Sequence, residues 1–145
     1  MKVMIDTNII LDVVFDREGL ADTSAKILRM CEDKRLNGVI TASSITDIFY
    51  IVRKHLHSKD SAYEVLEKIM EMVDIVTVSG EHIKTAFQKR ANDFEDCLMS
   101  VCAESNQCDF IVTRNKSDFT DTVIKVVTPE ELLLNNSAII AFTTS

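Results

Sequence analysis

The sequence contains no tryptophan, one proline and three glycines among its 145 residues, and aromatic residues make up only 6% of it. So little glycine and proline argues against a disordered, collagen-like or loop-built chain. No apolar run approaches the roughly 18 residues that a membrane-spanning helix needs. Asp6 interrupts the N-terminal segment, where a signal peptide would be uniformly apolar. We therefore expect a cytoplasmic protein without a membrane association.

Positive charge is also scarce, because the formal net charge is -7. This excess of acids argues against a protein that wraps nucleic acid in a general cationic surface. It leaves room for a nucleic-acid enzyme, since a carboxylate-rich metal site is itself negative until the metal binds. The four cysteines form no CxxC pair and match no zinc-site spacing, so we assign them to the core as small hydrophobic residues.

Short β-branched apolar runs alternate with helical patterns along the chain. Such runs without clean alternation are typical of strands that are covered on both faces of a parallel sheet. The predicted strands are Lys2 to Asp6, Gly38 to Thr41, Asp74 to Val78, Asp109 to Thr113 and Ile124 to Val127. The alternation predicts an α/β fold with a mainly parallel sheet and right-handed crossovers.

Helices are predicted between these strands from the spacing of apolar residues. Ser61 to Val73 is the clearest, because its apolar residues recur at helical spacing opposite a face of glutamates and a lysine. A short helix should follow Thr128, Pro129 and two glutamates, which form a typical helix start. The other predicted helices are Leu20 to Leu36, Ser43 to Leu56, Glu81 to Arg90 and Phe94 to Ser105. We expect one domain over residues 1–134, followed by a tail, 135–145, that could be a strand, an interface segment or disordered.

Single acids stand at places where strands end or helices begin. Asp6 ends the first strand, and the carboxyl ends of parallel strands face the ligand crevice; alternatively, Asp6 caps the next helix. Asp47 lies in an otherwise apolar helix, where a buried carboxylate needs a cation or hydrogen-bond donors; alternatively, it is a first-turn acid with Ser43 or Ser44 as the cap.

Two further segments carry acids next to polar residues. The segment DFED supplies Asp93, Glu95 and Asp96 at the start of a helix, where Glu95 is best explained as only a favourable first-turn acid. The segment TRNKSDF offers Thr113, Asn115 and Asp118 after the fourth strand, although it also fits a plain polar turn. If the fold brings these acids together, they would repel one another unless a hard cation such as Mg²⁺ or Mn²⁺ neutralised them. Such a cation can activate water against a phosphate.

The same segments, in the same order and context, resemble the PIN domain family. The resemblance rests on MIDTNIILDV, SSITDIFYIVRK, DFEDCLMSVCAE and IVTRNKSDF, and it extends to about Leu134. It implies a three-layer α/β/α fold and a ribonuclease that depends on Mg²⁺ or Mn²⁺ and leaves a 3′-hydroxyl and a 5′-phosphate. Bacterial single-domain members are often toxins of toxin–antitoxin modules. The resemblance therefore also implies a small antitoxin partner and a homodimer.

The resemblance also assigns residues to the expected site. Asp6, Asp47, Asp96 and Asp118 fall on the family's acidic positions, and Asp6, Asp96 and Asp118 are the expected metal ligands. Asp47 stands where the family usually has a longer Glu, so a water-bridged contact is expected there. The expected supporting polar residues are Thr7, Asn8, Asp93, Thr113 and Asn115.

Local basic residues must help an acidic protein to hold RNA. Arg114 and Lys116 flank Asn115 and are the candidates for phosphate contacts, although a solvated turn would also explain them. A second basic cluster contains Arg53, Lys54, His55, His57 and Lys59. Tyr50 and Tyr63 are assigned to the core or to an interface, so we expect a structured RNA that is recognised partly by its shape.

Two other functions fit the same residues less well. A PIN-like binding module without turnover is one, and the shorter Asp47 is its main support. A receiver-like phosphoacceptor that uses Mg²⁺ is the other, although the first strand ends in a single acid and the DFED helix has no role in that scheme.

Overall fold

The computed structural model describes residues 1–119 and 122–134, and its centre is a five-stranded sheet. The strands run in the order β3-β2-β1-β4-β5, and all neighbouring pairs are parallel. Their bounds are β1 Lys2–Ile5, β2 Asn37–Thr41, β3 Asp74–Val76, β4 Phe110–Val112 and β5 Lys125–Val127. All five strands predicted from the sequence are therefore confirmed, with small differences at their ends.

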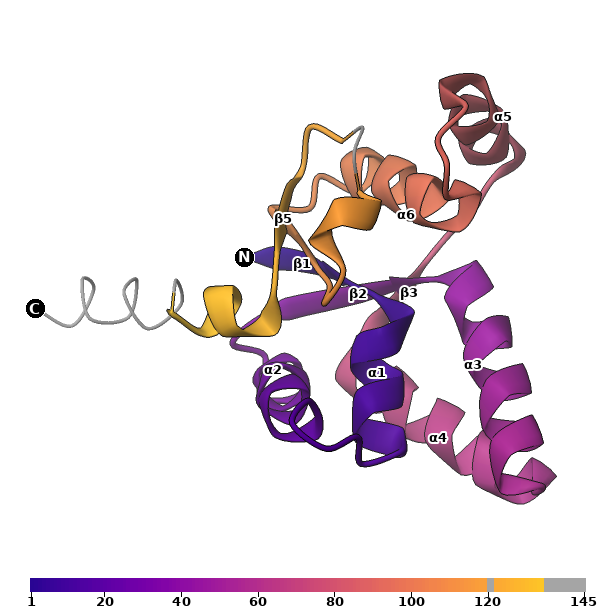
Figure 1. Ribbon diagram of the computed structural model, residues 1–145, viewed down its shortest axis with the longest axis vertical. Helices are drawn as coiled ribbons and strands as arrows, with labels where there is room; N and C mark the ends of the chain where they lie inside the picture. Colours follow the sequence, from indigo (N-terminus) through magenta and orange to yellow (C-terminus); the bar gives the residue numbers. More distant parts are fainter. Residues whose placement is uncertain (120–121, 135–145) are drawn as a thin grey trace, which may run out of the picture.

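Helices connect the strands and cover both faces of the sheet (Figure 1). Their bounds are α1 Thr7–Val14, α2 Ala21–Glu32, α3 Ala42–Leu56, α4 Lys59–Met72, α5 Gly80–Lys89, α6 Phe94–Ser105 and the 3₁₀ helix η1 Lys116–Asp118. Residues 129–134 are helical after β5, as the Pro-containing start predicted.

The prediction that one helix spans Leu20 to Leu36 was wrong at its C-terminal end. Helix α2 ends at Glu32, because the chain turns at Lys34, where φ is 65°. The backbone N–H groups of Arg35 and Leu36 then donate to the carbonyl of Met30 at 2.9 and 3.1 Å. These bonds close the helix end and direct the chain into β2.

Both faces of the sheet are apolar, as expected for strands buried on two sides. Alternate residues of one strand face opposite layers: Val3 and Ile5 pack against the layer of α1 to α4, whereas Met4 packs against α6. The same division separates Ile40 from Val39 in β2. Figure 1 shows the two layers, with α5 and α6 on one side of the sheet and α1 to α4 on the other. The predicted three-layer α/β/α architecture is confirmed.

The strand order places a topological switch between β1 and β4. From β1 the chain first builds β2 and β3 on one side, and it later returns to add β4 and β5 on the other. Ile5, the last residue of β1, pairs with Val112, the last residue of β4. In open α/β sheets, ligands bind in the crevice outside the carboxyl ends of the strands at such a switch.

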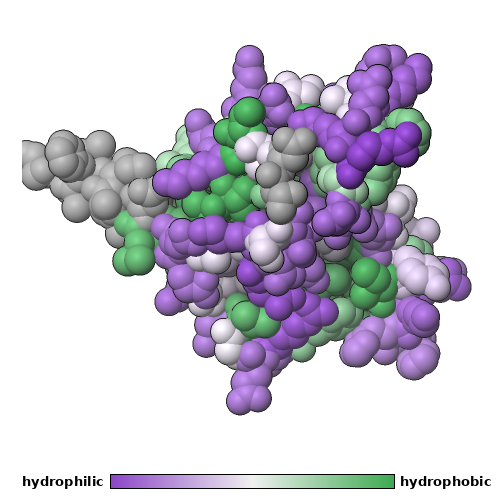
Figure 2. Space-filling view, turned by 45° about the horizontal axis from the view of Figure 1, so that its top comes forward, coloured by the Kyte–Doolittle hydropathy of each residue, from purple (hydrophilic) through white to green (hydrophobic). Residues whose placement is uncertain are grey.

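The four cysteines are free and buried, which confirms their assignment to the core. Burial raises the pKa of the Cys31 and Cys102 thiols to about 11. Hydrophilic residues cover much of the face in Figure 2, and apolar residues form separate patches on it. Within the described ranges, no helix is both long enough and apolar enough to cross a bilayer. The predicted tail, 135–145, lies outside the described residues.

Candidate active site

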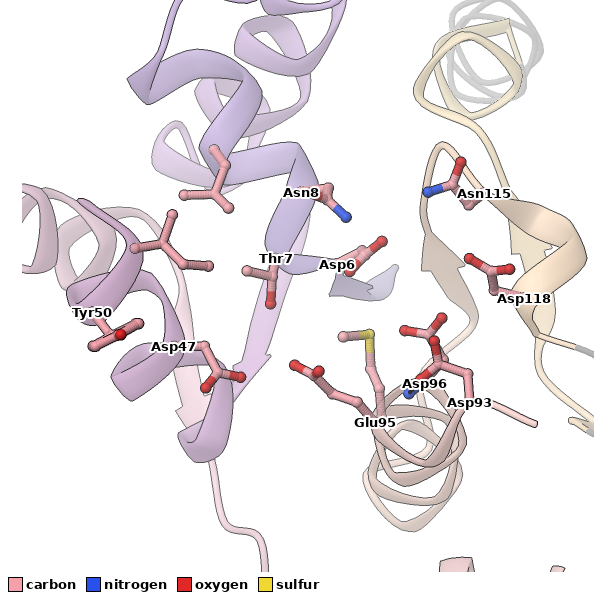
Figure 3. Close-up of a pocket in the computed structure, with 13 residues that line it drawn as sticks. Asp6, Thr7, Asn8, Asp47, Tyr50, Asp93, Glu95, Asp96, Asn115 and Asp118 are labelled. Carbon is pink, nitrogen blue, oxygen red and sulfur yellow. Dashed lines mark hydrogen bonds between the residues drawn. The ribbon is translucent and has the colours of Figure 1, made fainter. Parts of the chain in front are cut away.

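A cleft of about 410 Å³ opens at the switch between β1 and β4 (Figure 3). Six of its lining residues are carboxylic acids, and none is basic. The lining residues are Asp6, Thr7, Asn8, Leu11, Asp47, Tyr50, Ile51, Asp93, Glu95, Asp96, Met99, Asn115 and Asp118. Parallel topology has thus brought acids from four separate segments of the chain to one place.

Asp6 sits at the floor of this cleft, directly after β1. It occupies the N-cap position of α1, where the backbone N–H groups of Asn8 and Thr7 help to lower its pKa, although its carboxylate does not form a regular capping hydrogen bond. Instead, the buried hydroxyl of Thr113 donates to Oδ2 of Asp6 at 2.7 Å. The two residues meet because β1 and β4 are neighbours, and each residue follows the end of its strand. Burial raises the pKa of Asp6 above its usual value, although the Thr113 hydrogen bond opposes this shift. Capping alone therefore does not explain Asp6.

The tightest group of acids lies where α6 begins. The carboxylate oxygens of Asp93, Asp96 and Asp118 lie within 4.8 Å of one another. Asp93 also caps α6, since its Oδ1 accepts from the backbone N–H of Asp96 at 2.9 Å. Asp118 reaches the group from η1, the short helix that follows β4. The structure therefore places Asp93, which the sequence analysis gave only a supporting role, in the closest group and Asp6 beside it.

Asp96 shows the electrostatic consequence of this crowding. Partial burial and the negative charges of Asp6, Asp93 and Asp118 raise its pKa to about 7. Each neighbouring carboxylate opposes ionisation of Asp96, and a divalent cation would remove that repulsion. All of the donors are hard oxygens, the ligand type that Mg²⁺ and Mn²⁺ prefer. The residues present thus fit a divalent cation.

We expect the metal-free protein to lose stability as the pH rises from 5 to about 7, because folding raises the pKa of Asp96 from 3.8 to about 7. A raised pKa means that the folded state holds the proton more tightly than the unfolded chain does. The resulting stability is complete below the unfolded pKa and is lost as the pH passes the folded pKa. Thermal unfolding in a chelator, from pH 5 to pH 8, measures the effect.

Substitution of Asp96 by Asn isolates this contribution from the other titrating groups. The Tm of Asp96→Asn minus the Tm of the wild type should increase as the pH rises from 5 to 8. Millimolar Mg²⁺ should stabilise the wild type more at pH 8 than at pH 5. If the two proteins show parallel pH profiles, Asp96 is not destabilised by its neighbours.

Asp47 faces the acidic group from the opposite side of the cleft. Helix α3 is capped by Thr41, whose hydroxyl oxygen accepts from the backbone N–H of Ser44, so neither Ser43 nor Ser44 is the cap. No acid occupies the first turn of α3, so the interpretation of Asp47 as a first-turn acid was wrong. Its carboxylate instead points into the cleft towards Glu95 (Figure 3).

Glu95 is the acid that the sequence analysis dismissed as a simple first-turn residue. It lines the cleft, and a side-chain hydrogen bond with Asp47 is the largest effect that raises its pKa, to about 7. Partial burial and the charges of Asp47, Asp93 and Asp6 contribute to the same shift. Nothing in the local sequence distinguishes Glu95 from an ordinary helix-start acid; only the facing position of Asp47 does.

Polar groups without charge complete the lining. The hydroxyl of Thr7 is buried and has no hydrogen-bond partner among the described residues. It lies between Asp6 and Asp47 and points towards the cleft (Figure 3). A buried polar group without a partner is costly, so a bound cation, water or phosphate would supply what Thr7 lacks. Asn8 and Asn115 line the same opening, and the backbone N–H of Asn115 donates to the Thr113 hydroxyl at 3.1 Å.

Asp12 is a fully buried acid that the sequence analysis missed. Its carboxylate accepts hydrogen bonds from Arg17 Nη1 at 3.1 Å and from Ser24 Oγ at 3.3 Å. Arg114 Nε lies 2.9 Å from its Oδ2 as an ion pair without hydrogen-bond geometry. The cluster joins α1 to α2 and to the segment after β4. No sequence signal pairs Asp12 with Arg114, because the period of a strand or a helix does not show which side chains of different elements face each other.

The two cations expected to contact RNA both have partners within the protein. Arg114 pairs with Asp12, and its side chain is 25% exposed. Lys116 Nζ donates to both carboxylate oxygens of Glu131, at 2.9 and 3.2 Å, on the surface. Neither residue lines the cleft.

Of the two alternatives expected for Tyr50, the core or an interface, the structure excludes the core. Its side chain is 65% exposed and lines the cleft, so its assignment to the core was wrong. Tyr63, at 58% exposed, is not a core residue either; it lies edge-on to Phe49.

The chain is similar in sequence and in fold to proteins that are already known. The family model of the PIN domain matches residues 2–117. The chain is 25% identical over 135 residues to Ribonuclease VapC1 from Aquifex aeolicus, covering 90% of this chain and 92% of that protein. Its fold is similar to that of VapBC2 from Rickettsia felis, which was solved bound to a DNA fragment from its promoter. The TM-score is 0.69 at 17% identity, and the match covers 88% of this chain and 98% of that one.

A further similar structure is the VapC20 toxin of Mycobacterium tuberculosis, which cleaves the sarcin–ricin loop. Its TM-score is 0.60 at 9% identity, and the match covers 75% of this chain and 86% of that one. At these identities the solved structures establish the fold alone. Because the family model matches most of the chain, the protein belongs to the PIN domain family.

Proposed function

We propose that this protein is a metal-dependent endoribonuclease. The convergence of three carboxylates, from Asp93, Asp96 and Asp118, within 4.8 Å supports the proposal most directly. Similarity to a ribonuclease over nine-tenths of both chains supports RNA as the substrate. The receiver-like alternative has no support from the family match.

The residues of the cleft would have different roles in such a reaction. Asp93, Asp96 and Asp118 would hold Mg²⁺ or Mn²⁺, with Asp6 beside them. When bound, the cation supplies Lewis-acid activation of water and of the phosphodiester. Thr113 fixes Asp6 through one oxygen, at 2.7 Å, so the carboxylate keeps a single orientation. Asp47 contacts Glu95 across the cleft and raises the pKa of Glu95 to about 7, which makes Glu95 a candidate acid or base beside the scissile phosphate.

Contacts to RNA outside the cleft follow from the exposed cations. We propose Lys116 as a phosphate contact, because its pair with Glu131 lies on the surface, where solvent weakens it, and Lys116 can exchange this partner for a phosphate. Arg114 could present its partly exposed guanidinium while Nε keeps its contact with Asp12.

We further propose that the protein is the toxin of a toxin–antitoxin pair, forms a homodimer and acts in the cytoplasm, where its RNA is found. Support comes from the folds of VapBC2 and of the toxin–antitoxin complex from Klebsiella pneumoniae, which has a TM-score of 0.63. An antitoxin would be a small second protein that inhibits cleavage.

A cleavage assay tests the enzymatic proposal. Metal-stripped protein is incubated with end-labelled transfer and ribosomal RNA, with Mg²⁺, with Mn²⁺ or with chelator. We expect discrete fragments only with a divalent cation, and fragments with ligatable 3′-hydroxyls. If calorimetry shows Mn²⁺ binding but no RNA is cut under any condition, the protein is instead a PIN-fold binding module.

A further inference from the structure

One wall of the acidic cleft is aromatic. Tyr50 stands on α3, on the side of the cleft opposite Asp96 and Asp118 (Figure 3). Its ring is 65% exposed, and the neighbouring Ile51, which also lines the cleft, is 36% exposed. A tyrosine that is left in solvent beside a charged site contributes little to the stability of the domain. Its position indicates a ligand with a flat apolar face.

Cations follow Tyr50 along the same helix. Lys54 lies one turn further on α3, about 6 Å along the helix axis, and its Nζ is 5.9 Å from the centre of the Tyr50 ring. Arg53 and Lys54 are both exposed, and neither forms an ion pair with any described residue. In this they differ from Arg114 and Lys116, which have internal partners. Helix α3 therefore carries an acid, then an aromatic ring, and then two cations that have no carboxylate partner among the described residues.

RNA is the ligand that matches this arrangement of acids, aromatic ring and cations along α3. A phosphodiester needs cations where it meets the carboxylates, a nucleobase stacks on an aromatic ring, and the next phosphates require positive charge. A base in an A-form duplex is stacked on its neighbours and cannot reach a side-chain ring, so stacking requires an unpaired nucleotide.

Building on the proposed ribonuclease function, we propose that Tyr50 stacks on an unpaired base next to the scissile phosphate, while Lys54 and Arg53 bind the phosphates that follow. This contact requires the base beside the scissile phosphate to be unpaired, in a single strand or in a loop. This proposal adds a stacking contact to the expected recognition of a structured RNA by its shape, since a loop within a folded RNA offers unpaired bases.

Binding to short RNAs tests this proposal separately from cleavage. Asp96→Asn protein, which should not cut, is titrated against fluorescein-labelled single-stranded RNA and against the same RNA annealed to its complement. We expect tighter binding of the single strand. Tyr50→Ala should weaken single-strand binding by about tenfold, the loss expected for one base stack. Tyr50→Phe should retain the affinity, because the ring remains.

Two further variants separate stacking from charge. Tyr63→Ala, which removes an exposed tyrosine outside the cleft, is the matched control and should bind like the background. Lys54→Gln should reduce the slope of log affinity against log salt by about 0.7, the value for one lost phosphate contact on a single strand. Tyr50→Ala should leave that slope unchanged.

Three results would overturn the proposal. The first is equal affinity for the duplex and the single strand, and the second is single-strand binding that Tyr50→Ala does not weaken. The third is a change in oligomeric state, without a change in RNA affinity, in Tyr50→Ala; this result would assign the ring to a protein interface. Conversely, if Tyr50→Ala weakens RNA binding but the wild-type protein cuts no RNA, the proposal of base stacking stands and the proposal of nuclease activity fails.

Discussion

Asp96→Asn is expected to lower the rate of RNA cleavage by at least about a hundredfold, because a cation ligand supports several kcal/mol of transition-state stabilisation. Asp96 is the centre of the acidic group, since Asp6, Asp93 and Asp118 all raise its pKa. The amide has the same shape, so the fold should remain. Because the variant also relieves charge repulsion, it should be more stable at pH 8 than the wild type, a trade of stability against function.

The control for this variant lies on the same helix. Glu104→Gln removes an exposed carboxylate near the other end of α6, away from the cleft. It should leave cleavage, Mn²⁺ affinity and the pH profile of Tm unchanged. Cleavage by Asp96→Asn at the wild-type rate would show that this cleft is not the active site.

Asp12→Asn should produce the largest loss of stability, about 3 kcal/mol in the free energy of unfolding, as for other broken buried ion pairs. Asp12 is fully buried, and its two oxygens serve Arg17, Ser24 and Arg114. The amide leaves both guanidinium groups without a countercharge. Urea unfolding monitored by circular dichroism measures the change.

An exposed ion pair provides the comparison. Arg35 and Asp33 also lie 3.1 Å apart, but their side chains are 54% and 60% exposed. Asp33→Asn should therefore change the free energy of unfolding by less than about 1 kcal/mol. Equal effects of the two substitutions would mean that burial does not strengthen the Asp12 cluster.

Asp12→Asn should also slow cleavage, because Arg114 anchors the segment that carries Asn115 and Asp118.

The parts of the fold and site that depend on local sequence could be predicted. Parallel strands place their carboxyl ends at one edge, so Asp6 and Thr113 could be brought together from the strand pattern alone. The segment DFED likewise predicted that Asp93 and Asp96 lie together at the start of a helix, as they do at α6. These inferences need only the period of a strand or a helix and the direction of the chain.

The parts that depend on facing elements could not be predicted. Glu95 and Asp47 lie on different helices, and their hydrogen bond follows from how α3 and α6 pack across the cleft. Tyr50 is an aromatic residue among apolar neighbours in the sequence, and only the position of its helix at the open edge exposes it. Asp12 is an acid in an apolar helix, like Asp47, yet Asp12 is enclosed by arginines and Asp47 lines the cleft.

The enclosed sulfur atoms have a chemical consequence for the whole molecule. At neutral pH, thiols with a pKa of about 11 are almost entirely protonated, and thiolates are the species that peroxides and alkylating agents attack. Cys31 and Cys102 are therefore shielded both by surrounding atoms and by their retained hydrogens. Neither of these two thiols is therefore expected to act as a redox-sensitive site at neutral pH.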